Sequence, residues 1–199
     1  MLHVLRMTLR PLLLNFSCLL LEVGFKAHLF LLLLDLRWRK PALHSLKCNI
    51  GCLWHPGTFN SGASWLIRDH SGSVLFHSRR SYALVTSQLE AELLSFSWAI
   101  SSLANLRFSS VIFESPLILA RKALMEPHLF PQLRPLLDEI FITLQSFVSW
   151  SLVHTSYTAN RVANAIAISV IETNQLQSYV ARSGPVWLNG LLADDAAPW

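Results

Sequence analysis

Hydrophobic residues recur at helical spacing in one long stretch of the chain. Successive members of this stripe lie four, three, four and three residues apart, which places them on one face of an α-helix. They are Leu89, Leu93, Phe96, Ile100 and Leu103. The spacing therefore predicts an amphipathic helix over residues 89–103. A second stripe, with small residues suited to close packing, predicts a helix over residues 161–172.

Short apolar runs bounded by turn residues predict the strands. Residues 63–68 and 74–80 flank the sequence DHSG at 69–72, which is typical of a β-hairpin. Residues 46–50, 109–114 and 148–154 have the same strand-like character, and residues 57–62 form a predicted loop. Ser115 is a suitable N-cap for a helix that starts at Pro116, because proline loses no hydrogen bond at the first helical position. A further helix is predicted to begin near Pro135.

The order of these elements indicates the fold class. Three strands joined by hairpins come first, and strands that alternate with helices follow. Such an order is typical of an α/β architecture in which helices cover a mixed sheet.

The first 36 residues differ from the rest of the chain. Two leucine-rich runs, 11–21 and 29–34, are separated by Glu22, Lys26 and His28. A single membrane span across this gap would bury Lys26 at a cost of about 2.5–3.5 kcal/mol near the helix centre. A signal peptide would use Arg6 and Arg10 as its basic end, but no small-residue cleavage site follows. We expect a hydrophobic leader outside the domain, with secretion or membrane attachment as the alternative.

Composition narrows the classes of protein. Of the 199 residues, 52% are hydrophobic and 14% charged, which excludes a disordered chain, a coiled coil and a collagen-like repeat. The net charge of +4 permits an anionic partner. The basic excess lies in residues 37–188, since residues 189–199 contain Asp194 and Asp195 but no base. Three cysteines do not form a disulfide framework, so a nuclear or cytoplasmic location is expected.

An ordered set of motifs resembles a known family. The motifs are WRKP at 38–41, KCNIG at 47–51, GASWLIRD at 62–69, LEAEL at 89–93, VIFES at 111–115, His154, and NRVANAIA at 160–167. Together they resemble the RNase H-like domain of plant non-LTR retroelements over residues 37–188, with residues 189–199 as a C-terminal tail. The resemblance implies an RNase H-like fold, a five-stranded mixed sheet flanked by helices.

The same resemblance implies a site with four carboxylates. In this family they hold two Mg²⁺ ions at the scissile phosphate of the RNA strand in an RNA–DNA hybrid, because Mg²⁺ prefers oxygen ligands and a metal pair stabilises both reacting oxygens. Gly51 stands where the first Asp of K-x-N-x-D-G belongs, and Glu92 keeps the carboxylate of the A-E-L motif. Pro116 replaces the third carboxylate and Asn164 the fourth, with an amide oxygen that is a weaker ligand. His154 lies ten residues before Asn164, like the family's histidine that assists proton transfer.

These replacements lead to a functional hypothesis with two alternatives. We expect a monomeric nucleic-acid-binding domain whose partner is an RNA–DNA hybrid, which is catalytically inactive and binds no Mg²⁺, or at most binds metal weakly at Glu92. Aspartates at positions 51, 116 and 164 together are predicted to restore metal binding. The alternatives are an active hybrid ribonuclease and a scaffold for protein interaction.

Structural roles compete with the catalytic ones. Glu92 is favoured near a helix start by the helix dipole, and His154 suits a strand end. A zinc set of His44, Cys48, Cys52 and His55 requires a helix, because residues 44 and 52 would lie about 26 Å apart on a strand. We expect a strand with a buried Cys48.

Basic residues are candidates for a phosphate-contacting surface near Trp38 and Trp54. Scattered, solvated charges are the alternative. The residues are Arg37, Arg39, Lys40, Lys47, Arg79, Arg80, Arg121, Lys122, Arg161 and Arg182.

Overall fold

The computed structural model of the chain describes residues 37–173 and 176–197. The predicted leader, with its runs at 11–21 and 29–34, lies outside these described residues. Within the described part of the chain, no helix is both long and apolar enough to cross a membrane.

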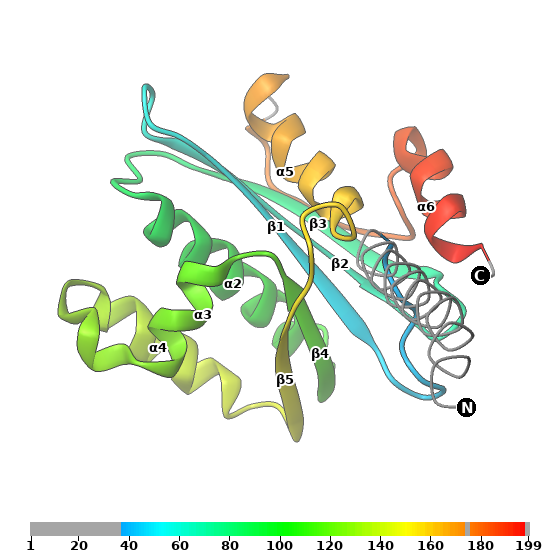
Figure 1. Cartoon of the computed structure of the whole chain (residues 1–199), viewed down its shortest axis with the longest axis horizontal. Coiled ribbons are helices and arrows are strands. Elements are labelled where there is room, and N and C mark those ends of the chain that lie inside the picture. Colours follow the sequence, from blue (N-terminus) through cyan, green and yellow to red (C-terminus); the bar gives the residue numbers. More distant parts are fainter. Residues whose placement is uncertain (1–36, 174–175, 198–199) are drawn as a thin grey trace, which may run out of the picture. The chain divides into compact units, whose positions relative to one another are not determined.

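A mixed sheet forms the centre of the domain, with the strand order β5-β4-β1-β2-β3-β6 (Figure 1). Antiparallel pairs join β1 to β2, β2 to β3 and β3 to β6, whereas β4 pairs in parallel with both β1 and β5. The strands are β1 (Lys47–His55), β2 (Asn60–Arg68), β3 (Val74–Tyr82), β4 (Ser110–Ser115), β5 (Ser149–His154) and β6 (Tyr179–Arg182). The mixed α/β sheet is confirmed.

The expectation of five strands is wrong, because β6 adds a sixth strand beside β3. This strand has only four residues, Tyr179–Arg182. A segment of that length is too short to show the alternation of apolar and polar residues by which strands are recognised in a sequence.

Helices cover both faces of the sheet. In Figure 1, α2, α3 and α4 lie on one face, and α5 and α6 lie on the other. The described helices are α2 (Gln88–Asn105), α3 (Ile118–Met125), α4 (Arg134–Leu144), α5 (Arg161–Glu172) and α6 (Asn189–Ala196), with short 3₁₀ turns at Pro127–Leu129, Pro131–Leu133 and Val186–Leu188. The predicted helices over 89–103 and 161–172 correspond to α2 and α5.

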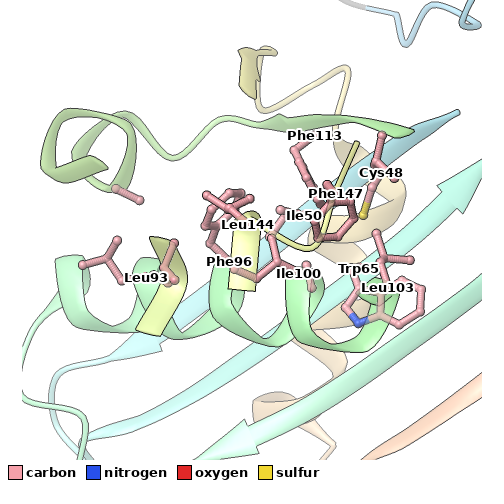
Figure 2. Close-up of a cluster of buried hydrophobic side chains, with 14 of the residues drawn as sticks. Cys48, Ile50, Trp65, Leu93, Phe96, Ile100, Leu103, Phe113, Leu144 and Phe147 are labelled. Atoms are coloured by element: carbon pink, nitrogen blue, oxygen red, sulfur yellow. The ribbon is translucent and has the colours of Figure 1, made fainter. Parts of the chain in front are cut away.

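The largest hydrophobic core lies between the sheet and α2, as Figure 2 shows. The apolar stripe of α2 supplies Leu93, Phe96, Ile100 and Leu103, all of them buried. Phe96 meets Phe113 of β4 edge to face, with 5.4 Å between ring centroids. The buried stripe explains why α2 forms, since tertiary packing of an apolar face supplies most of a helix's stability in a protein.

Two segments differ from their predicted form. Helix α3 begins at Ile118 and not at Pro116, because β4 extends through Ser115. The Ser115 hydroxyl oxygen still accepts a hydrogen bond, from the backbone N–H of Leu117 at 3.0 Å. The segment expected as a C-terminal tail contains α6, whose Asp195 is buried.

Candidate functional site

The four positions matched to the family's carboxylates lie on four neighbouring elements. Gly51 is in β1, Glu92 is in α2, Pro116 directly follows β4, and Asn164 is in the first turns of α5. Because β1 and β4 pair in parallel, Pro116 lies at the same end of the sheet as Gly51. Near Gly51, burial raises the pKa of the Cys52 thiol to about 11, and the Glu92 carboxylate contributes to that shift.

Helix α5 approaches β1 most closely at Gly51. A Cβ atom built on Gly51 would lie 2.4 Å from the carbonyl oxygen of Ala163 and 2.7 Å from the hydroxyl oxygen of Ser64. That hydroxyl donates a hydrogen bond of 2.6 Å to the same carbonyl. Packed atoms do not approach within such distances, so the first ligand position has no room for a side chain. An aspartate at position 51 therefore requires α5 or β1 to move, and the prediction that three aspartates rebuild the metal site depends on such a shift.

Asn164 is held in a buried amide network. Its Oδ1 accepts a hydrogen bond from Asn160 Nδ2 at 2.9 Å, and its Nδ2 donates to the carbonyl oxygen of Tyr157 at 2.9 Å. Asn160 also donates to the carbonyl of Ile50, the residue before Gly51. An ionised carboxylate at position 164 would face the Tyr157 carbonyl without a proton to donate. Asn160 therefore fixes the start of α5 on β1, and Asn164 accepts a hydrogen bond from the same amide.

Glu92 binds the start of another helix. Its Oε2 accepts the backbone N–H of Ala120 in the first turn of α3 at 3.0 Å, and its Oε1 accepts from Gln88 Nε2 at 3.0 Å. Helix α3 has no side-chain N-cap of its own. The carboxylate of Glu92 thus satisfies a donor that a helix start leaves unpaired.

His154 and the start of α3 border a small apolar pocket. His154 is exposed at the end of β5. Phe96, Leu117 and Leu152 contribute apolar lining, and Arg121 and Ser115 also border the pocket. His154 therefore has a largely apolar neighbourhood.

A buried network of charged side chains lies next to these positions, and no sequence pattern predicts it. Asp195 of α6 pairs with Arg68 of β2 at 2.8 Å and with Arg161 of α5 at 2.9 Å. Burial lowers the pKa of Arg68 to about 10, although Asp195 opposes that shift. The guanidinium also lies 3.3 Å from the ring centroid of Trp38. Arginine in an apolar strand requires a buried partner, but the sequence does not show which acid supplies it.

The network continues through Asn49 to Glu114. Asn49 Oδ1 accepts from Arg68 at 2.7 Å, and Asn49 Nδ2 donates to Glu114 at 3.1 Å. Glu114 also accepts from the Trp38 indole at 2.8 Å and pairs with Lys47 at 2.6 Å. Two basic residues expected at a phosphate-binding surface, Lys47 and Arg161, therefore form ion pairs with acidic residues of the domain.

Comparison with family models decides the classification. A model described as reverse transcriptase-like matches residues 51–170, more than half of the chain. The chain belongs to the reverse transcriptase-like family. No curated protein matches this reverse transcriptase-like chain.

Solved structures share the fold of this reverse transcriptase-like domain. RNase H1 from Halobacterium salinarum is 18% identical, with a TM-score of 0.59 over 65% of this chain and 98% of that protein. LC11-RNase H1, isolated from compost, is 16% identical, with a TM-score of 0.59 over 67% of this chain and 99% of that protein. Its complex with an RNA/DNA hybrid gives a TM-score of 0.52 at 14% identity, over 66% of this chain and 99% of that protein. The RNase H-like fold is confirmed.

In the reverse transcriptase-like domain the four family positions lie near one end of the sheet, where Glu92 and Asn164 hydrogen-bond to other protein groups and Gly51 packs against α5. Among the described residues, no group of three His, Cys, Asp or Glu side chains is arranged to hold a metal ion. Cys48, Cys52 and His55 lie on strand β1, so the expected strand with a buried Cys48 is present. Cys48 is buried, and burial raises the pKa of its thiol well above the ordinary value.

Proposed function

We propose that the chain is a nucleic-acid-binding domain of the RNA–DNA hybrid ribonuclease type that does not cleave its ligand. The observation that carries this proposal is the packing at Gly51, where the Ala163 carbonyl and the Ser64 hydroxyl occupy the space of a ligand side chain. The family's RNase H-like fold supports affinity for nucleic acid, and the altered site supports the loss of hydrolysis.

The residues present do not fit a pair of Mg²⁺ ions. Gly51 and Pro116 offer no side-chain oxygen. Both carboxylate oxygens of Glu92 accept hydrogen bonds from the protein, and the amide oxygen of Asn164 accepts from Asn160. Two closely spaced divalent ions require several anionic oxygens to offset their repulsion. The domain therefore lacks the charge on which this type of hydrolysis depends.

A cleavage assay tests the loss of hydrolysis. Purified full-length chain is incubated with a labelled RNA–DNA hybrid in Mg²⁺ and, separately, in Mn²⁺. We expect no more cleavage than with the Glu92→Gln variant. Cleavage that this substitution abolishes would show an active ribonuclease and overturn the proposal.

A binding assay tests the nucleic-acid function. We expect the full chain to shift a labelled hybrid at low salt, with affinity that falls steeply as salt rises, because phosphate contacts release counterions. Absence of binding at low salt would favour the alternative, a scaffold for protein interaction. The hydrogen bonds of Glu92 and Asn164 within the protein are compatible with that alternative too.

A further inference from the structure

A strip of alternating arginine and aromatic side chains lies along the edge of the sheet formed by β3 and β6. Phe76, Arg80 and Tyr82 are separated by even numbers of residues on β3, so they share one face of the sheet. That face is the one covered by α2, since the Tyr82 hydroxyl donates to the Leu94 carbonyl at 3.3 Å. Arg182 of β6 is paired with Phe76 and extends the same face.

Ring contacts hold the two arginines of this face. The Arg80 guanidinium carbon lies 4.7 Å from the ring centroid of Trp98 in α2 and 4.9 Å from that of Tyr82. The Arg182 guanidinium carbon lies 5.1 Å from the ring centroid of Phe76. We call these five residues, Phe76, Arg80, Tyr82, Trp98 and Arg182, the arginine–aromatic strip. A guanidinium held by a ring loses less conformational freedom when it binds a ligand.

No ion pair within the described part of the domain involves the two arginines of the strip, although the Glu139 carboxylate of α4 lies near enough to Tyr82 to add to the rise that burial causes in that hydroxyl's pKa. The ion pairs found there involve Lys47, Arg68, Arg134 and Arg161, and neither Arg80 nor Arg182 takes part. Arg182 is exposed and Arg80 is half-buried. Their N–H donors therefore remain available to an anionic ligand.

We propose that the arginine–aromatic strip binds single-stranded nucleic acid. Arginine donors match phosphate oxygens, and a guanidinium plane that rests on a half-buried ring can stack against an unpaired base on its other face. The strip from Phe76 to Tyr82 extends about 20 Å along β3 at 3.3 Å per residue, enough for several nucleotides. An acidic peptide would satisfy the charge but has no bases to stack, and a duplex keeps its bases inside.

Most of this surface is distant from Gly51. Four of its residues lie on β3 and β6, whereas Gly51 lies on β1, and β2 separates β1 from β3 in the sheet. Trp98 shares α2 with Glu92 but lies six residues further along the helix. The inference goes beyond the proposed function because it requires neither hybrid binding nor cleavage.

Fluorescence anisotropy with the full chain tests the strip. The probes are a single-stranded pyrimidine oligonucleotide of about 15 nucleotides, an abasic strand of equal length, and an RNA–DNA hybrid of equal length. We expect the Arg80→Gln, Arg182→Gln double variant to bind the single strand about tenfold more weakly. We also expect its dependence of log K on log salt to become shallower by about 1.4, the value for two lost phosphate contacts. The abasic strand should bind more weakly than the normal strand.

Arg79→Gln is the matched control. Arg79 is the neighbour of Arg80 on β3, but it faces the other side of the sheet, where its guanidinium carbon lies 4.9 Å from the ring centroid of Tyr179. Arg79→Gln removes one charge, so it is compared with the single variants Arg80→Gln and Arg182→Gln, and it should change affinity by less than about twofold. Circular dichroism confirms folding, and each single variant replaces the double variant if the latter unfolds.

Three outcomes overturn the inference: no single-strand binding at low salt, equal effects of Arg79→Gln and the strip variants, or equal affinity for the abasic strand. Hybrid binding is measured in parallel. If the chain binds the single strand but not the hybrid, the proposed function is contradicted and the inference about the arginine–aromatic strip is supported.

Discussion

At the scale of single residues, Gly51 shows how one position decides what the site can hold. Substitution of Gly51 by Ala places a methyl group 2.4 Å from the backbone carbonyl of Ala163, so α5 or β1 must shift. We expect the free energy of unfolding to fall by about 1–3 kcal/mol, as for other overpacked cores. Urea denaturation of the full chain measures the change.

Gly190→Ala is the control for this prediction. Gly190 lies in α6, and a Cβ there would meet no atom within 4 Å. Alanine at this position should leave stability unchanged or raise it by up to about 1 kcal/mol, because Ala favours helix. Equal stability of the Gly51→Ala variant and the unsubstituted chain would contradict the close packing.

The sequence indicates which positions to compare with the family's motifs, but it does not reveal their partners. The motif around Asn164 places it where the resembling family has an aspartate. Its donation to the Tyr157 carbonyl depends on the loop before α5, whose conformation no sequence pattern specifies. The hydrogen-bonding role of this amide is therefore visible only in three dimensions.

At the scale of elements, α3 depends on a side chain from α2. Glu92→Ala removes the acceptor of the Ala120 N–H and leaves a buried donor unpaired. We expect a loss of about 0.5–2 kcal/mol, the usual range for a lost helix cap, and faster hydrogen exchange in the first turn of α3. Hydrogen exchange followed by mass spectrometry measures the local effect.

Glu126→Ala provides the comparison, since Glu126 is exposed at the opposite end of α3. A carboxylate there lies beside the negative end of the helix dipole, so its removal should not weaken the helix. If both variants exchange at the same rate as the unsubstituted chain, Glu92 does not cap α3.

Strand β6 gives the domain a pH dependence. His77 of β3 hydrogen-bonds to the carbonyl of Ser183, directly after β6, and to the Tyr179 hydroxyl. Burial lowers the pKa of His77 below 6.5; the Ser183 carbonyl opposes this shift, and Arg79 adds to it. The unfolded chain therefore binds the proton more tightly than the folded chain.

The contribution of His77 to the free energy of unfolding should be complete above pH 6.5. It should decrease as the pH falls below that value. Urea denaturation at a series of pH values checks this, with His77→Gln as the variant in which that part of the pH dependence disappears. An identical pH profile for the variant would refute the role of His77.

Long periodic elements were predictable, whereas short ones were not. The stripe of α2 repeats over several turns, and the alternating stretch near 149–154 corresponds to β5. By contrast, β6 has four residues, and the short helix α6 has no strong apolar face. These two elements form through contacts with distant parts of the chain, which local patterns do not encode.

At the scale of the whole molecule, Asp195 joins the C-terminal helix to the sheet. Its two oxygens pair with Arg68 and Arg161, and its side chain is almost fully buried. Asp195→Asn leaves the buried Arg68 charge without its counter-ion, so we expect a loss of about 3–5 kcal/mol of stability. Thermal and urea denaturation of the full chain test this prediction.

Asp194→Asn is the matched control. Asp194 is 63% exposed and lies 3.7 Å from Arg161, so its pair is screened by water. Its substitution should change stability by less than about 1 kcal/mol. Equal effects of the two substitutions would contradict a special role for the buried pair.

The close approach of α5 to Gly51 also has an evolutionary consequence. An aspartate at this position requires a wider gap between β1 and the Ala163 carbonyl. A mutation that introduced one would first have to displace a packed helix, before any metal ligand could be gained. Selection for stability therefore acts against a carboxylate at position 51.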